Sequence, residues 1–319
     1  MTRVIRFLRW LDGQFFAEAP AERLATVRVL TGAFAVIYLL VRANVLGDFR
    51  VPPGRFAGVG LAAILARPVP GWLQLAVFAA CVGCGILFTL GVRYRVSGPV
   101  FALLLLWVTS YRNSWGMVFH TDNLLVLHVI ALACSDAAEA LSWDARARPP
   151  AVASGRFGWP LRLLMALTAL AYLLAGVAKL KVAGISWTDG EVLRDHIAYD
   201  ALRKSQIGSL YSPLAASLVQ LQWLFPVLSW FTLLLELAGP WVLWSPRLRA
   251  AWAAGLWSFH LGVLISMVIA FPYPLSGVAF VALFRCERLW EWPALAPIQR
   301  FFRAAGLRAP GSRVKLSGR

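Results

Sequence analysis

Hydrophobic residues along this chain gather in long runs, and short polar or basic segments separate one run from the next. A helix that crosses the hydrocarbon core of a bilayer needs roughly 20 apolar residues. Eight runs stand out, of which 124–134 and 275–284 are shorter than that length: 24–43, 72–92, 98–118, 124–134, 161–181, 218–244, 250–271 and 275–284. We therefore predict an all-α, polytopic membrane bundle of about eight transmembrane helices within residues 21–290.

The segments that flank the predicted bundle have a different pattern. Within residues 1–20, arginines recur at every third position (Arg3, Arg6 and Arg9), with apolar residues between them. This spacing predicts an amphipathic helix that lies in the headgroup plane of the membrane. Residues 291–319 form a basic tail, which we expect to lie in the cytoplasm and to begin with a second amphipathic piece.

Composition and charge support the membrane assignment. Of the 319 residues, 60% are hydrophobic and only 14% are charged, whereas a soluble domain carries about 25% charged residues. The net charge of +16 is divided among short clusters between the runs. That distribution argues against a nucleic-acid partner and is typical of basic cytoplasmic loops. It favours eight spans with both termini in the cytoplasm, in a cell inner membrane.

The cysteines indicate neither a metal site nor a disulfide framework. All four lie within or beside apolar runs, and Cys81 and Cys84 form a CxxC pair. No second pair or nearby histidine cluster completes a set of metal ligands. We interpret the cysteines as small packing residues.

The predicted topology brings polar groups from three segments to the outer end of the bundle. They are His120 and Asp122 after the third run, Lys179 at the end of the fifth run, and the polar loop 182–213. An ionisable group inside a span requires a partner or a function. This end of the bundle is therefore the predicted site.

Lys179 is the best candidate for a reactive group. It shares a helix face with Tyr172, Ala175 and Gly176, whose small members permit close packing against a neighbouring helix. Burial there would penalise the ammonium and make the neutral amine available as a base. The alternative is structural, because a lysine at a helix end commonly extends its amine to the headgroups.

The other candidates also have structural interpretations. His120 and Asp122 can belong to the cap of the fourth helix, since Asp122 suits a helix start. His260, near the middle of the seventh run, can donate a hydrogen bond to a neighbouring helix. Glu236 and Arg28 can form a structural ion pair between two spans.

The order of motifs resembles a known family. The segment AGVAKL (175–180), followed by Trp187 and Asp189, resembles the vitamin K-dependent gamma-carboxylases and their bacterial relatives with a horizontally transferred transmembrane domain. In the carboxylases this motif is AGVKKL, and its second lysine, which corresponds to Lys179, is the proposed base. Further similarities follow in order over residues 20–290: Arg28, GVRYRVSG (91–98), YRN (111–113), His120, SWDA (142–145), and His260 with FPYPL (271–275).

The resemblance implies proton abstraction driven by a reduced quinone. In the carboxylases, oxidation of vitamin K hydroquinone to its epoxide generates a base that removes a proton from a glutamate γ-carbon, and carbon dioxide adds. By resemblance, Lys179 is the general base, and His120 and His260 stabilise the developing anion. We assign the binding of the quinone-type cofactor to residues of the same outer segments: Trp187, Asp122 and Arg112.

Two departures from the carboxylase pattern shape the functional expectation. Ala178 stands where the carboxylases have another lysine, and the sequence ends at Arg319 without their β-rich luminal region. We therefore expect chemistry on a lipophilic quinone-type substrate more than on peptidyl glutamate, with a membrane or extracytoplasmic protein as a further partner. The alternative is a non-catalytic lipid-binding or scaffold protein. A transporter is disfavoured because no inverted repeat is apparent.

Overall fold

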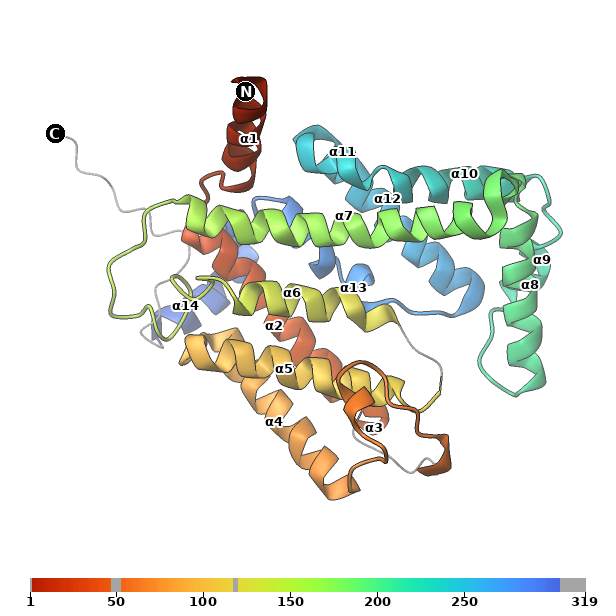
Figure 1. The fold of residues 1–319 in the computed structure, drawn as a ribbon, viewed down its shortest axis with the longest axis horizontal. Helices are drawn as coiled ribbons and strands as arrows, with labels where there is room; N and C mark the ends of the chain where they lie inside the picture. The colour runs from red at the N-terminus through yellow and green to blue at the C-terminus, as the bar shows by residue number, and fades with distance from the viewer. Residues whose placement is uncertain (1, 47–52, 117–119, 305–319) are drawn as a thin grey trace. The chain divides into compact units, whose positions relative to one another are not determined.

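The computed structural model describes residues 2–46, 53–116 and 120–304, and within these ranges every regular element is a helix (Figure 1). The only pairing of extended backbone in these ranges is an isolated bridge between Ala19 and Ser154. The predicted all-α class is therefore confirmed. The chain divides into two compact units, which we describe separately: unit 1 is Met1–Leu164 with Phe284–Arg319, and unit 2 is Met165–Leu283.

Unit 1 contains the N-terminal helices and the C-terminal segment. Its α-helices are α1 (Thr2–Phe15), α2 (Ala21–Val41), α3 (Ala43–Leu46), α4 (Gly71–Leu90), α5 (Tyr94–Asn113), α6 (Asn123–Ala133), the first part of α7 (Gly155–Ala183), and α14 (Ala296–Ala304). Its 3-10 helices are η1 (Pro53–Arg55), η2 (Gly60–Ile64), η3 (His120–Asp122), η6 (Cys286–Glu291) and η7 (Pro293–Leu295).

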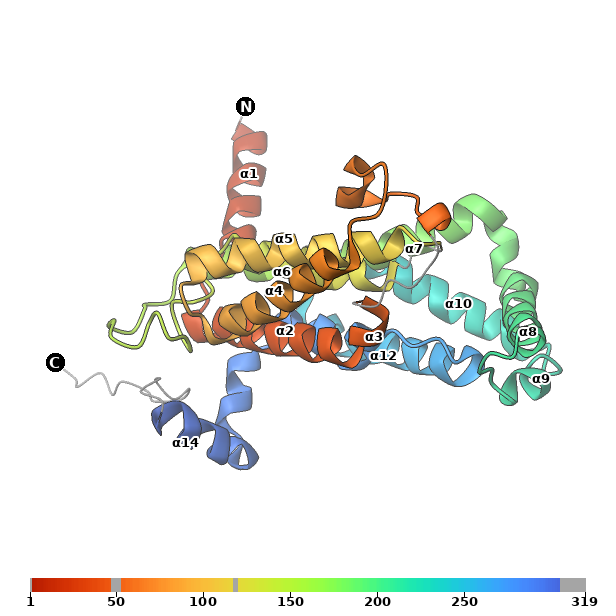
Figure 2. The same ribbon diagram turned by 90° about the horizontal axis from the view of Figure 1, so that it is seen from below.

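The core of unit 1 forms where α2 and α5 each pack against both α4 and α6 (Figures 1 and 2). Phe88 of α4 and Phe101 of α5 are fully buried, and their ring centroids are 5.2 Å apart. Small residues permit this close packing: a Cβ at Gly85 would lie 2.9 Å from the Phe101 ring. Such small contact residues are typical of helix pairs in membranes.

Hydrogen bonds bind the C-terminal segment of unit 1 to the start of α2. Arg23 donates two hydrogen bonds to the carboxylate of Glu287, at 2.9 and 2.7 Å. Close by, the indole of Trp290 donates to the hydroxyl of Thr26 at 2.8 Å. These contacts join residues 264 positions apart in the sequence.

Unit 2 holds the last part of α7 and everything up to residue 283. Its further helices are α8 (Glu191–Gln206), α9 (Leu214–Leu218), α10 (Leu224–Leu237), α11 (Gly239–Trp244), α12 (Pro246–Met267) and α13 (Pro272–Leu275), with η4 (Gly184–Asp189) and η5 (Val278–Leu283) as 3-10 helices. Glycines bring α10 and α11 close to α7. A Cβ at Gly176 would lie 3.0 Å from Cβ of Glu236, and one at Gly239 would lie 2.6 Å from the carbonyl oxygen of Ala169.

The helix lengths support a multi-pass membrane protein. Four segments are long and apolar enough to cross a bilayer, namely Ala21–Val41, Gly71–Leu90, Gly155–Asp189 and Pro246–Met267. Asn123–Ala133 and Leu224–Leu237 are shorter apolar helices. The number of eight spans and the cytoplasmic placement of the termini stay predictions.

Two of the predicted runs are interrupted. The sixth, 218–244, starts at the end of α9 and contains α10 and α11, with breaks at 219–223 and at Ala238. The eighth, 275–284, contains the end of α13 and the 3-10 helix η5, separated by Gly277 at φ 77°. It therefore contains no helix of spanning length, because about 20 residues are required.

The N-terminal segment is helical, as its arginine spacing predicts. On α1 the side chains of Arg6, Arg9, Leu8 and Trp10 are all exposed, the last two by 56% and 48%. An exposed helix with this composition suits a membrane surface. Its position in the headgroup plane stays a prediction, as does the cytoplasmic tail, whose residues 305–319 lie outside the described residues.

Candidate active site

Lys179 and Glu236 form a buried ion pair in unit 2. Lys179 lies in the last part of α7, and its Nζ donates to both carboxylate oxygens of Glu236, at 2.6 and 2.7 Å. The Glu236 side chain is 4% exposed and the Lys179 side chain 19%. Gly176, one turn before Lys179, makes the approach possible because α10 packs directly on its backbone. The carboxylate is thus enclosed, while the lysine side chain is partly exposed.

Aromatic rings flank the lysine amine. Nζ lies 4.9 Å from the ring centroid of Trp187 in η4 and 5.6 Å from that of Phe259 in α12. A cation over an aromatic face is stabilised by the ring quadrupole. The carboxylate of Glu236 and the two rings therefore surround Nζ with groups that attract a cation. The neutral amine expected from the sequence stays a prediction.

A second polar pair lies about two turns before Lys179 on α7. The hydroxyl of Tyr172 and Nε2 of His260 are hydrogen bonded at 2.8 Å, and both residues are buried. The Tyr172 ring stacks on Phe280 and meets Trp252 edge-on, with centroids 6.4 and 5.7 Å away. Nδ1 of His260 is buried and has no hydrogen-bond partner among the described residues. A buried polar atom without a partner is uncommon and marks a place for a water molecule or a ligand.

The two pairs are arranged along one side of α7. Tyr172, Gly176 and Lys179 are separated by four and three residues, so they lie on one helix face. Glu236 packs against this face at Gly176. Two of the predicted catalytic residues therefore have their partners along this side of α7: Lys179 binds Glu236, and His260 binds Tyr172.

The sequence interpretation missed the partner of Lys179. It suggested an ion pair between Glu236 and Arg28, and this pairing is wrong. Arg28 donates a hydrogen bond to the carbonyl of Leu141 within unit 1, whereas Glu236 binds Lys179 within unit 2. The signal that could have identified Glu236 is its isolation as a carboxylate in an apolar run, since such a group must find a cation.

The remaining predicted site residues belong to unit 1. Asp122 accepts a 2.6 Å hydrogen bond from the hydroxyl of Tyr38, which also accepts one from Arg42 at 2.9 Å. Asp122 occupies the N-cap position of α6, but its side chain makes no capping hydrogen bond there, so the capping interpretation of this side chain is wrong. Arg112 is half-buried near the end of α5.

The proposed joint action of His120 with Lys179 stays a prediction. The backbone of His120 lies in η3 of unit 1, and its side chain lies outside the described residues. Lys179, Trp187 and His260 belong to unit 2.

Arg28 and the motifs at 91–98 and 142–145 form a second cluster, in unit 1. The guanidinium of Arg28 is fully buried against the turn at Gly91, where a Cβ would lie 2.1 Å from its Nη1. The carboxylate of Asp144 accepts hydrogen bonds from the backbone N–H groups of Arg93 and Tyr94, at 2.9 and 2.7 Å. Residues 142–145 are thereby docked onto the first turn of α5. This cluster has a structural role that the sequence did not distinguish from a catalytic one.

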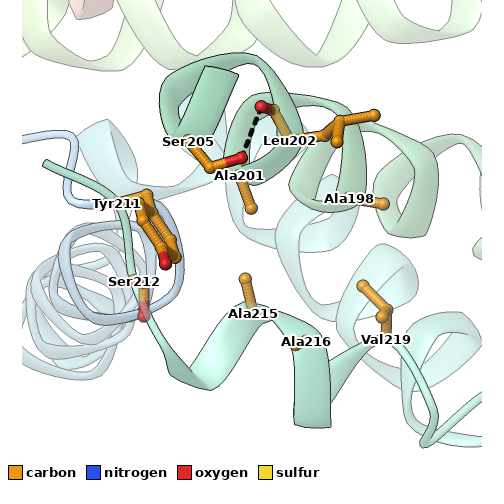
Figure 3. A pocket seen from close by; sticks show the side chains of 9 residues that line it. All are labelled: Ala198, Ala201, Leu202, Ser205, Tyr211, Ser212, Ala215, Ala216 and Val219. Atoms are coloured by element: carbon orange, nitrogen blue, oxygen red, sulfur yellow. Dashed lines mark hydrogen bonds between the residues drawn. The ribbon is translucent and has the colours of Figure 1, made fainter. Parts of the chain in front are cut away.

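An apolar pocket lies between α8 and α9, with a volume of about 280 Å³ (Figure 3). Small residues, among them Ala198, Ala201 and Ala215, form much of its lining, and no charged or histidine side chain lines it. Groups of three or more histidine, cysteine or carboxylate side chains that could hold a metal ion do not occur in the part of the chain that the structure describes. The Lys179–Glu236 pair is therefore the candidate site.

Comparison with known proteins gives one match. A family model described as the HTTM domain matches residues 16–290. No curated protein matches the chain, and no solved structure does.

Proposed function

Since the chain belongs to the HTTM domain family, we propose that it is a carboxylase-like membrane enzyme that deprotonates a reduced, vitamin K-type quinone with its Lys179–Glu236 pair. The observation that carries the proposal is this ion pair, which lies at the end of a membrane-length helix with aromatic rings around its amine. We place the protein in a cell inner membrane, with both termini in the cytoplasm.

The residues around the pair suit a planar aromatic diol. The indole nitrogen of Trp187 is buried and has no hydrogen-bond partner among the described residues. It can donate to an oxygen of the quinone-type compound, while the rings of Trp187 and Phe259 offer flat apolar faces. Lys179, exposed by 19%, is the member of the pair that an incoming molecule can reach.

Each member of the pair has its own role in the proton transfer. Lys179 is the general base: its Nζ takes up the hydroxyl proton as it passes one of its own protons to the carboxylate of Glu236, 2.6 Å away, and the ammonium that results stabilises the negative charge that remains on the oxygen. Since the pair gains one proton in this step, its net charge changes from zero to +1 opposite the new anion. The reduced quinone supplies the redox chemistry: with dioxygen it gives the quinone epoxide and one water molecule, which takes up both hydroxyl hydrogens.

The test is formation of the epoxide by the purified protein in lipid nanodiscs. The reaction contains vitamin K hydroquinone, dioxygen and bicarbonate, and the quinone products are separated by chromatography. We expect epoxide from the parent, and a loss of about 100-fold or more in kcat for both Lys179→Ala and Glu236→Gln, as for removal of a general acid–base group. Lys181→Ala is the matched control, because Lys181 is exposed and lies on the same helix.

Two results would contradict the proposal. Undiminished epoxide formation by Lys179→Ala would remove the pair from the reaction. A parent protein that binds the hydroquinone or phospholipid but forms no epoxide would indicate the non-catalytic alternative, a lipid-binding or scaffold protein in which the ion pair only joins α7 to α10.

A further inference from the structure

We propose that the apolar pocket between α8 and α9 binds one acyl chain of a membrane phospholipid. Neither the family match nor the proposed function assigns a ligand to this pocket. The proposal is separate from the reaction at the Lys179–Glu236 pair, and its test requires no catalytic activity.

The segment that contains both helices, residues 191–219, lies where two membrane-length helices end. It begins two residues after the segment Gly155–Asp189, and Nζ of Lys204 donates a 2.5 Å hydrogen bond to the carbonyl oxygen of Met267, the last residue of α12. Both Gly155–Asp189 and α12 are long and apolar enough to cross a bilayer. Because their ends meet at residues 191–219, this segment lies at a membrane surface.

The orientation of α8 agrees with this position. Within unit 2, α8 lies crosswise to α7 and α12 (Figures 1 and 2), so it runs in the plane of the bilayer. Four apolar side chains of the segment are exposed by 57, 63, 77 and 56%: Leu202, Ile207, Leu210 and Leu214. On a helix at the membrane surface, such side chains extend about 5–10 Å into the boundary between headgroups and acyl chains. Lipid hydrocarbon is therefore the phase that surrounds the pocket.

Small side chains on both helices create the pocket. Figure 3 shows residues of α8 on one side, residues of α9 on the opposite side, and Tyr211 and Ser212 at one end. Alanines face the space from both helices: Ala198, Ala201, Ala215 and Ala216. Protein interiors are normally close-packed, so this space is available to a ligand. Leu202 and Tyr211 line the pocket and are also exposed, which shows that it opens to the surface.

The size and chemistry of the pocket suit hydrocarbon. An apolar cavity of about 150 Å³ binds benzene, so about 280 Å³ has room for a longer apolar chain. All nine lining residues are uncharged. The hydroxyls of Ser205 and Ser212 donate to the backbone carbonyls of Leu202 and Ile265, at 2.8 and 2.6 Å. The hydroxyl of Tyr211, which is 45% exposed, is left to meet the ester groups of a phospholipid at the mouth.

The experiment maps lipid contacts by photo-crosslinking. The full chain is placed in nanodiscs of phosphatidylcholine and phosphatidylglycerol that contain a phosphatidylcholine with a diazirine in one acyl chain, and mass spectrometry locates the adducts. The reference is the exposed face of α4 at Trp72 and Leu75, which contacts bulk lipid. We expect the yield per residue over 198–205 and 211–219 to exceed this reference about 5-fold, since a preference of about 1 kcal/mol gives that ratio.

Two variants fill the pocket from its rim. Ala198→Phe and Ala216→Phe each introduce a ring at an exposed lining residue, and each should lower the yield at the lining to the level of the α4 reference. The matched control is Ser217→Phe, because Ser217 is exposed on α9 next to Ala216 and does not line the pocket. It should leave the yield unchanged.

Three results would overturn the proposal. A yield at the lining of the parent no higher than at α4 would mean bulk lipid contact only, and this result depends on no variant. A loss in Ser217→Phe equal to that in Ala216→Phe would show that the adducts do not come from the pocket. In a further arm, phylloquinone is added to the nanodiscs, and we expect the adducts to persist; their loss would assign the pocket to the isoprenoid tail of a quinone.

Discussion

The Lys179–Glu236 pair makes a sharp prediction about stability that is independent of any reaction. The perturbation is removal of each partner alone and of both together: Lys179→Met, Glu236→Met and the double variant. Methionine has about the volume of either side chain and is apolar, so it fills the space without a charge. Lys181→Met gives the background effect of the same substitution at an exposed position on α7.

The two single variants should differ in size. Without Lys179, the carboxylate of Glu236, only 4% exposed, is left without a counter-charge, which costs about 3–5 kcal/mol of unfolding free energy. Without Glu236, the ammonium keeps the faces of Trp187 and Phe259 and, at 19% exposure, can extend toward water, so the cost is about 1–2 kcal/mol. Additive effects would sum to about 4–7 kcal/mol, but the double variant leaves no charge behind and should lie within about 1 kcal/mol of the parent.

The assay is denaturant titration of the purified protein in mixed micelles, followed by tryptophan fluorescence, with all variants at one detergent composition. A double-mutant cycle then gives a coupling energy of at least about 3 kcal/mol. The reasoning would be refuted if both single variants matched Lys181→Met within about 0.5 kcal/mol and the double variant were additive. That outcome would describe a solvated surface pair.

Two further predictions concern unit 1. Gly91→Ala places a Cβ on a residue with φ 65° and within 2.1 Å of Nη1 of Arg28, so it should destabilise the protein by about 2–4 kcal/mol. The control is Gly83→Ala in α4, which has open space around it and should be neutral or stabilising. Equal effects of the two substitutions in thermal denaturation would disprove the steric argument. Burial alone would raise the pKa of Glu287, but hydrogen bonds and charge from Arg23 outweigh it and hold that pKa below its usual value. The pair therefore stabilises the fold above the usual glutamate pKa of about 4.3 and loses this contribution as the pH falls through the lower folded value. Glu287→Gln should be about 1 kcal/mol less stable than the parent at pH 7 and should approach it near pH 3, and a gap that does not change with pH would contradict this.

Hydrophobic patterning alone was sufficient to predict the helical class and the membrane. The runs 24–43 and 72–92 correspond to α2 and α4 within three residues at each end, because a bilayer-spanning helix depends on length and apolarity along a single segment. The same rule was inadequate at 218–244 and 275–284. There Gly239 and Pro240 start the new helix α11, and Gly277 separates α13 from η5; average hydropathy does not register such breaks.

The sequence by itself also singled out Lys179 and His260 as candidates, because a cation or an imidazole in an apolar run is conspicuous and the AGVAKL motif resembles a known family. Only the tertiary structure decided what these groups bind. Glu236 is 57 residues from Lys179, and Tyr172 is 88 residues from His260. Which helix faces meet depends on packing at contacts such as Gly176 against Glu236. Since a buried ionisable group depends on its neighbours in space, the pairing of Lys179 with Glu236 could be learned only from the fold.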